Sequence, residues 1–245
     1  DNAKIKNLGI INSYFSGFRF AFLGGMVGFA KYSTFENCYI QATIVGKQEI
    51  DGYAGGFVGL SGDSNYYNCY ANVTVEASDS DDNLSVGGFI GSSYYNDGYL
   101  KNVAASATIK VAARTVKVGS LIGNNRDYVH KNTYYDIDKY ATGIGASSND
   151  ATTKGVKTTA FTNGTVCQKL GGHFYKFVSN STQHYQECTV CGNKTTAESH
   201  NIVEKATCKE LAVCGTCGES HGEYDYTVHV SDEFDNNGFS LCCGY

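Results

Sequence analysis

Two Cys-x-x-Cys-Gly motifs carry the residues best suited to chemistry in this chain of 245 residues. They are Cys188-Thr-Val-Cys191-Gly192 and Cys214-Gly-Thr-Cys217-Gly218. In such a knuckle the turn directs backbone amides at the two thiolates, and the glycine relieves the turn. Because both motifs end in glycine, they indicate metal binding more strongly than disulfide formation.

Upstream histidines and a cysteine complete a set of four donors for each knuckle. The donors of the first unit are His173, His184, Cys188 and Cys191. The donors of the second unit are His200, Cys208, Cys214 and Cys217, so that His184 stands near the place of Cys208. Tetrahedral zinc takes four nitrogen or sulfur ligands, which predicts one structural zinc ion in each unit. A third, incomplete unit runs from His229 to the adjacent Cys242 and Cys243.

Three other interpretations of these cysteines remain open. The four knuckle cysteines would form a single zinc ribbon, since the stretch between Cys191 and Cys214 is close to the usual ribbon spacing. An oxidising exterior would turn the cysteines into disulfides instead. A redox Cys-x-x-Cys would need a thioredoxin-like βαβ setting, which the pattern does not indicate. A region this small and polar needs some covalent or metal link, because its apolar core is thin. His221 fits no unit and is expected to be solvated.

The elements that precede these motifs follow a regular sequence repeat. Its glycine phrases are GGMVG at Gly24 to Gly28, GGFVG at Gly55 to Gly59, GGFIG at Gly87 to Gly91 and GSLIG at Gly119 to Gly123. Each phrase is followed by an asparagine, and these are Asn37, Asn68, Asn102 and Asn132, with Asn7 as a fifth. A fixed period of roughly 20 to 50 residues is typical of stacked units that each bury little alone.

Apolar and polar residues alternate after each asparagine, which predicts a half-buried strand. Aligned on the asparagines, the apolar columns are Cys38, Cys69 and Val103; Ile40, Ala71 and Ala105; Ala42, Val73 and Ala107; and Ile44, Val75 and Ile109. The glycine phrase is expected to add a second, shorter strand, and its glycines permit a sharp corner or a close approach of the backbone. The pattern predicts an all-β parallel β-helix, or β-solenoid, of about four to five coils. Its asparagines would form a side-chain ladder, and Cys38 and Cys69 would be packing residues.

The phrase GGFVG followed by NCYANVTV resembles the GLUG repeat of bacterial surface proteins. That repeat is found in large adhesins and in the amino-terminal region of some immunoglobulin A proteases. The resemblance covers residues 1 to 140 and implies an extracellular β-helical module without catalytic residues. The His and Cys units similarly resemble small repeats near the ends of surface adhesins of gut Firmicutes.

These patterns divide the chain into three parts. Residues 1–140 form the GLUG-type β-solenoid, 141–172 a closing loop with a short capping helix, and 173–245 the Cys/His-rich modules, the last one truncated. The helix would start near Thr158 or Thr159 and stop at Gly171. Its apolar residues would cover the last coil; they are Phe161, Val166, Cys167 and Leu170. Cys167 is therefore expected to be a core residue.

Composition narrows the function. A net charge of −5 argues against nucleic-acid binding, which needs a basic face. No run of 18 apolar residues exists, so we expect no membrane span in this segment. The polar, Tyr-rich, lightly charged composition suits an extracellular or cell-surface protein, and the absence of proline suits paired strands. The sequence contains no H-E-x-x-H, G-x-S-x-G or phosphate-loop motif, and we expect no enzyme activity.

The resulting hypothesis is a non-enzymatic, extracellular structural or adhesive module of a larger bacterial surface protein. Its partners would be a host or matrix protein or glycan, or further copies of itself in a fibre. One alternative is a β-helix polysaccharide lyase or hydrolase, which would need paired carboxylates or a Lys or Arg base on one face. Another is the non-catalytic amino-terminal region of a secreted protease.

Overall fold

The computed structural model describes residues 1–18, 21–48, 52–79, 83–94, 98–113, 116–146, 152–230 and 235. Contacts within the chain divide it into two units. The first unit comprises residues 1–174 and 189–191, and the second comprises 175–188 and the residues from 192 onward. No helix in the described parts is both long enough and apolar enough to cross a membrane.

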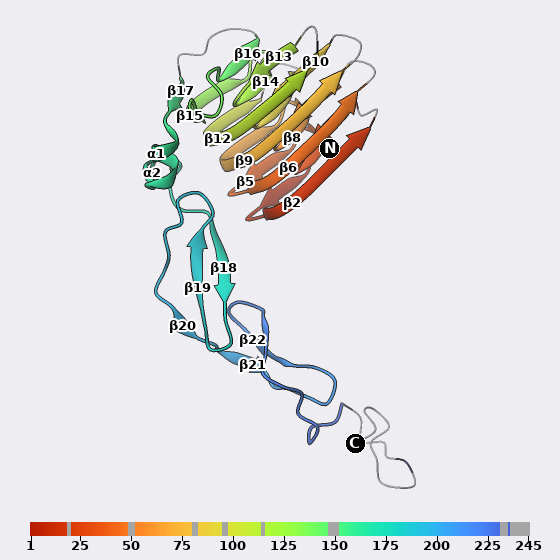
Figure 1. Ribbon diagram of the computed structural model, residues 1–245, viewed down its shortest axis with the longest axis vertical. Helices are drawn as coiled ribbons and strands as arrows, with labels where there is room; N and C mark the ends of the chain where they lie inside the picture. Colours follow the sequence, from red (N-terminus) through yellow and green to blue (C-terminus); the bar gives the residue numbers. More distant parts are fainter. Residues whose placement is uncertain are drawn as a thin grey trace. The chain divides into compact units, whose positions relative to one another are not determined.

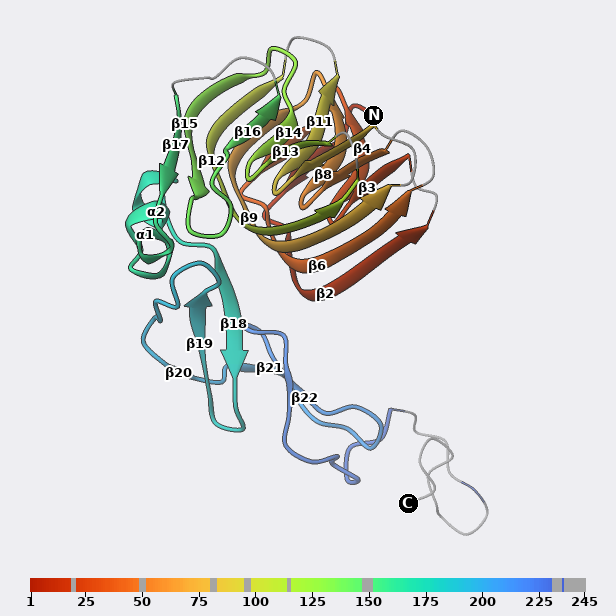
Figure 2. The ribbon, with the colours of Figure 1, turned by 45° about the horizontal axis from the view of Figure 1, so that its top comes forward.

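Three parallel sheets wrap the first unit into a β-solenoid of about four turns (Figures 1 and 2). The sheet with the longest strands, called the long sheet here, contains β1 (Lys4–Lys6), β2 (Gly9–Phe18), β5 (Thr34–Glu36), β6 (Tyr39–Gln48), β9 (Asn65–Asp79), β12 (Tyr99–Ala112), β15 (Val129–Asp136) and β17 (Thr153–Val156). The second sheet contains β3 (Phe22–Gly24), β7 (Gly52–Gly55), β10 (Leu84–Gly87) and β13 (Val116–Gly119). The third contains β4 (Val27–Lys31), β8 (Val58–Gly62), β11 (Ile90–Tyr94), β14 (Ile122–Asn124) and β16 (Ile144–Ala146).

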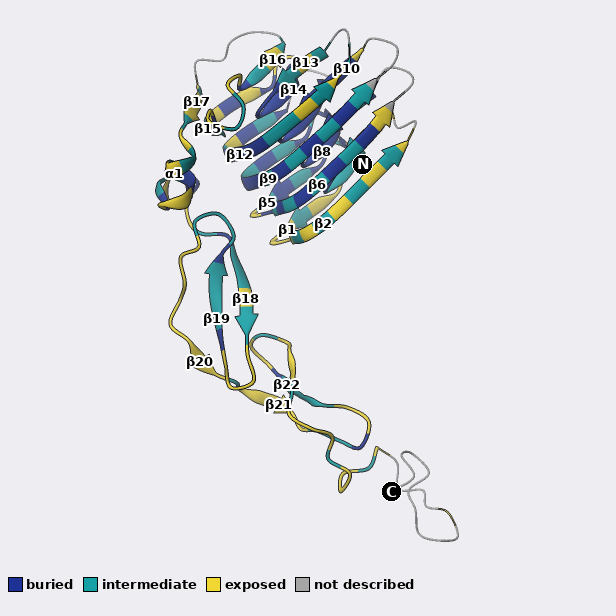
Figure 3. Ribbon diagram, viewed as in Figure 1, coloured by how far each residue is buried: buried dark blue, intermediate teal, exposed yellow. Residues whose placement is uncertain are grey.

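The strand registers confirm the predicted apolar columns. In successive coils of the long sheet, one column contains Ile40, Ala71 and Ala105, and the next contains Ala42, Val73 and Ala107. All six side chains are buried, and along β6 and the second half of β9 the buried residues alternate with partly exposed ones (Figure 3). Cys38 and Cys69 are buried in the same core and form no disulfide, which agrees with a packing role.

The predicted asparagine ladder is present. Each side chain donates from Nδ2 to the Oδ1 of the asparagine one coil earlier, over 3.1, 3.0, 2.8 and 2.7 Å from Asn37, Asn68, Asn102 and Asn132. All five asparagines have left-handed φ angles, between 52° and 59°. Asparagine tolerates this conformation better than most residues and can also bridge to the next coil, which glycine cannot.

Substitution of Asn68 separates these two contributions. Asn68→Gly keeps the left-handed backbone and removes two ladder hydrogen bonds, at a cost of about 1–2 kcal/mol. Asn68→Ala also places a Cβ in the left-handed region, so we expect a further loss of about 1 kcal/mol. Denaturant unfolding of both variants measures the difference. Equal stabilities for the two variants would show that the left-handed backbone at position 68 does not disfavour alanine relative to glycine.

The glycine phrase forms a corner between two short strands instead of one strand of its own. Strand β7 ends at Gly55 and β8 begins at Val58, so the corner contains the second glycine and Phe57. Phe57 stacks on Phe89 of the next coil, with ring centroids 4.5 Å apart. The backbones of adjacent coils approach too closely at this corner for a side chain at the glycines. The corner and the close approach agree with the expectation from the glycines. The division of the phrase between two strands is not evident from the sequence, because so short a segment shows no period.

Two short helices, α1 (Thr158–Thr162) and α2 (Thr165–Lys169), replace the single predicted helix. Gly164, with a φ of +83°, separates them, and Gly171, with a φ of +90°, follows α2 as predicted. The helices do not cover the last coil. Their apolar residues Phe161, Val166 and Leu170 pack on the outer face of the long sheet, against Tyr70, Ala104 and Tyr134 of three successive coils. Large aromatic residues at outward positions provide this surface.

The solenoid also extends further than predicted. Strands β16 and β17 lie in residues 141–172, where the sequence predicts only a closing loop and a helix, and they pair in parallel with β14 and β15. The Asn132 side chain, at the end of the ladder, also donates to the carbonyl oxygen of Lys169 in α2. The boundary is missed because β16 and β17 are short and their segment lacks the full glycine phrase.

The second unit contains two small antiparallel sheets. The first is formed by β18 (Tyr175–Ser179), β19 (Gln183–Cys188) and β20 (Glu198–Ser199), and the second by β21 (Ile202–Glu204), β22 (Ala212–Cys214) and β23 (Ser220–His221). Between residues 175 and 230 only four side chains are buried, and these are His184, Cys188, Cys208 and Cys214. Potential metal ligands therefore occupy the interior that aliphatic residues fill in an ordinary domain.

Candidate metal centres

The two knuckles have the same backbone structure. Gly192 donates its N–H to the carbonyl of Cys188 over 2.9 Å, and Gly218 does the same to Cys214 over 2.8 Å. Both glycines have positive φ angles, +71° and +75°. The residue after each second cysteine must thus adopt a left-handed backbone conformation, which explains why both motifs end in glycine.

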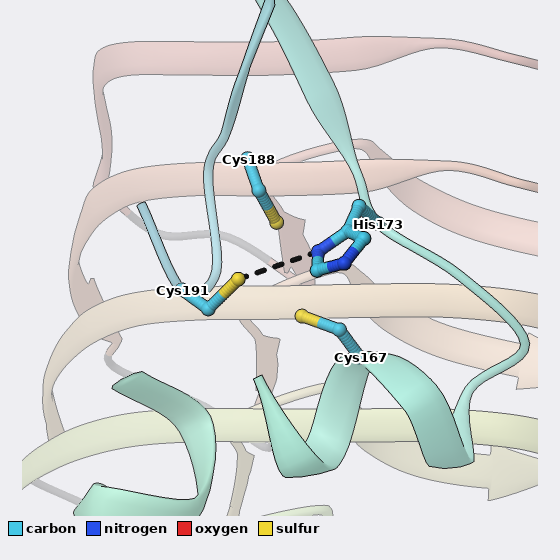
Figure 4. Close-up of side chains that lie close together, drawn as sticks. All are labelled: Cys167, His173, Cys188 and Cys191. Carbon is cyan, nitrogen blue, oxygen red and sulfur yellow. Dashed lines mark hydrogen bonds between the residues drawn. The ribbon is translucent and has the colours of Figure 1, made fainter. Parts of the chain in front are cut away.

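The first cluster contains Cys167, His173, Cys188 and Cys191 (Figure 4). One donor atom from each residue lies within 4.8 Å of all the others, and Cys191 Sγ lies 3.3 Å from His173 Nδ1. Cys167 comes from α2, and the Gly171–Gly172 pair that follows lets the chain reverse before His173. The backbone N–H of Thr189 donates to Phe174, which holds the knuckle beside the histidine.

The second cluster contains His184, His200, Cys214 and Cys217, whose donor atoms also lie within 4.8 Å of one another. The two histidine Nδ1 atoms are 3.3 Å apart. His200 Nδ1 lies 3.7 Å from Cys217 Sγ, and His184 Nδ1 lies 3.9 Å from Cys214 Sγ. His200 Nε2 is 2.9 Å from the carbonyl of Asn180. Because a carbonyl can only accept, Nε2 carries a proton, and Nδ1 is the ring nitrogen that faces the cluster.

The electrostatics of the second cluster favour a thiolate. Burial opposes ionisation of Cys214, but hydrogen bonds from the Cys217 backbone, the His200 side chain and other backbone amides together lower the pKa of its thiol to about 5. The carbonyl of Asn180 and the Cys214 side chain raise the pKa of His200. A thiolate present near neutral pH is the form that binds a metal ion.

The structure regroups the eight residues predicted as ligands. His184 belongs with the second knuckle, whereas the sequence grouping assigns it to the first. Cys208 belongs to neither cluster, and Cys167, expected to be a core residue, completes the first. The physical reason is strand pairing: β19 pairs with β20, and His184 lies opposite Glu198, which closely precedes His200. Sequence spacing within one repeat unit cannot reveal a donor that lies in that unit but joins the metal cluster of the next unit through strand pairing.

The structure also bears on the other interpretations of the cysteines. Each knuckle belongs to a separate cluster, so the four knuckle cysteines do not meet in one ribbon. No disulfide joins any of the eight cysteines that the structure describes. His221, expected to be solvated, lies against His200, with ring centroids 3.6 Å apart and ring planes tilted by 32°.

No family model, curated protein or solved structure matches this chain. Its class therefore rests on its own architecture. The protein is a parallel β-solenoid followed by small β modules with Cys/His clusters that could hold metal ions.

Proposed function

We propose that this chain is a non-enzymatic, extracellular adhesive module of a bacterial surface protein. The solenoid would bind glycans on its long sheet, and zinc ions would stabilise the small modules that follow. The observation that carries the binding proposal is a polar groove on the outer face of the long sheet.

The groove has a volume of about 410 Å³ and is lined mainly by uncharged polar side chains. Successive coils contribute the amides of Gln41 and Asn72 and the hydroxyls of Thr43, Thr74 and Thr108. Tyr14, which is 66% exposed, adds an aromatic face, and Lys139 donates to Asn72 Oδ1 over 3.3 Å. Amides and hydroxyls both donate and accept hydrogen bonds, as the hydroxyls of a sugar do. A row repeated from coil to coil suits a glycan chain with repeating units.

The hydrolase form of the leading alternative, a β-helix polysaccharide lyase or hydrolase, requires other groups in the groove. The lyase form would need a Lys or Arg base, and the lysine of the groove, Lys139, donates to Asn72 Oδ1. A glycosidase needs two carboxylates on either side of the bond to be cleaved. The side chains that line the groove are amides, hydroxyls, apolar residues, one tyrosine and one lysine. This lining favours binding over hydrolysis.

Zinc is the metal that fits the two clusters best. Zn–N bonds of 2.0–2.1 Å and Zn–S bonds of about 2.3 Å in a tetrahedron place two nitrogens about 3.3 Å apart and a nitrogen and a sulfur about 3.6 Å apart. The corresponding distances in the second cluster are 3.3 Å between the nitrogens and 3.7 and 3.9 Å between nitrogen and sulfur. Four protein ligands leave no open position, so zinc would be structural.

A glycan array with mucosal and plant polysaccharides tests the binding proposal. Wild-type protein is expected to bind a subset of the glycans, and Tyr14→Ala combined with Asn72→Ala to weaken that binding at least tenfold, because aromatic contact and amide hydrogen bonds are lost together. Tyr94→Ala is the matched control, since Tyr94 is exposed on another sheet. Binding that survives the double substitution would exclude this groove, and release of new reducing ends would establish the enzyme instead.

Self-association into fibres is a second candidate, supported by one edge of the solenoid. Strands β3 and β4 each stand at the end of their sheet and pair on one side only. Phe22 and Phe29, on these strands, are 41% and 38% exposed, with ring centroids 5.4 Å apart. An open strand edge with exposed aromatics can pair with another chain. Electron microscopy at high concentration would show filaments, and dispersed monomers would reject this candidate.

A further inference from the structure

The two clusters obtain their ligands by the same rule. Each contains the two cysteines of a knuckle, the histidine that precedes that knuckle at nearly the same spacing in both, and one donor from an earlier segment of the chain. That earlier donor is Cys167 in the first cluster and His184 in the second. It is called the carried-over donor here, because it lies before the histidine that starts the module.

A backbone contact accompanies each carried-over donor. In the first cluster, Gly172, the residue just before His173, donates its N–H to the carbonyl of Cys167 over 2.9 Å. In the second, Ser199, the residue just before His200, is the register partner of Gln183, which adjoins His184. The contact brings the carried-over donor beside the module's histidine before the knuckle is reached.

Backbone hydrogen bonds also join a third pair of such segments in the described chain. Cys208 donates its N–H to the carbonyl of Val228 over 2.9 Å, and Val228 is the residue just before His229. A second bond, from Asp225 N–H to the carbonyl of Thr207, holds the same two segments together. As in the first cluster, one backbone hydrogen bond thus links the cysteine to the residue just before the histidine, with the cysteine here as the donor.

The burial of Cys208 supports the same conclusion. Its side chain is 6% exposed, in a stretch where the other three buried residues, His184, Cys188 and Cys214, are all cluster members. Neither cluster uses Cys208. Membership of the two clusters therefore accounts for the burial of every buried residue in this stretch except Cys208.

We propose that Cys208 and His229 are ligands of a third zinc centre, with Cys208 as its carried-over donor. This proposal rests on the zinc role proposed above for the two clusters. The second module would then contribute His200, Cys214 and Cys217 to its own centre and Cys208 to the next.

Native mass spectrometry of the full chain reconstituted with zinc tests this proposal. We expect three zinc ions in the wild-type protein and two in each of Cys208→Ser and His229→Gln. Cys69→Val is the matched control and should retain three, since Val103 occupies the equivalent place in the next coil. If Cys208→Ser loses more than one ion through misfolding, His229→Gln decides: two ions support the third centre and an unchanged count overturns it.

The wild-type count separates this inference from the proposal on which it depends. A wild-type protein that binds two zinc ions, with the same count in Cys208→Ser, would reject the third centre and leave the two zinc clusters standing. A wild-type protein that binds no zinc under these conditions would reject the zinc role as a whole.

Discussion

Removal of zinc by a strong chelator is expected to unfold the second unit and leave the solenoid folded. Between residues 175 and 230 the only buried side chains are two cluster cysteines, one cluster histidine and Cys208, so apolar burial contributes little there. Structural zinc supplies about 10–16 kcal/mol of apparent binding energy in small domains, which is then folding energy. Hydrogen exchange should show loss of amide protection from β18 to β23, while β6, β9 and β12 stay protected.

Substitution of single ligands refines this prediction. His184→Asn should release the metal of the second cluster and expose β21 to β23, whereas His173→Asn should release the metal of the first. The sequence grouping predicts instead that both substitutions affect the same ion. Unchanged protection of β18 to β23 after complete metal removal would show that the modules fold without a metal.

A single added carbon at Gly88 is expected to be among the most damaging changes in the solenoid. A Cβ at this position would lie 2.1 Å from the carbonyl oxygen of Ser120 and 2.3 Å from the Cβ of Ala107. Gly88 N–H also donates to Gly119 over 3.1 Å, so the coils cannot separate without loss of hydrogen bonds. We expect Gly88→Ala to lower the free energy of unfolding by about 3 kcal/mol or more.

Gly28→Ala is the matched control, because its Cβ would meet one backbone oxygen at 2.9 Å and no other atom closer than 3.8 Å. We expect a loss of about 1 kcal/mol there. Tyrosine fluorescence during denaturant unfolding is a suitable probe, since the chain has no tryptophan and 19 tyrosines. Similar losses of unfolding free energy in the two variants would contradict the view that close contact between coils requires glycine at position 88.

Much of the solenoid follows from the sequence because its interactions are periodic. Cys69 and Val103, or Asn68 and Asn102, occupy the same place in adjacent coils, and stacking brings equal places together. An alignment of the sequence with itself therefore predicts both the core columns and the ladder. The left-handed backbone at the asparagines and the corner at the glycines are conformations, which residue types indicate only indirectly.

The sequence by itself determined the parallel solenoid, its core columns, its asparagine ladder and the residue types of the metal clusters. Only the tertiary structure decided which donors meet. His184 joins His200 through pairing of β19 with β20, and Cys167 reaches His173 through the turn after α2. The physical reason is that periodic stacking is encoded in local spacing, whereas a four-ligand cluster depends on pairing between segments that do not repeat. The placement of α1 and α2 on the outer face of the sheet has the same cause, since it depends on aromatic residues from separate coils.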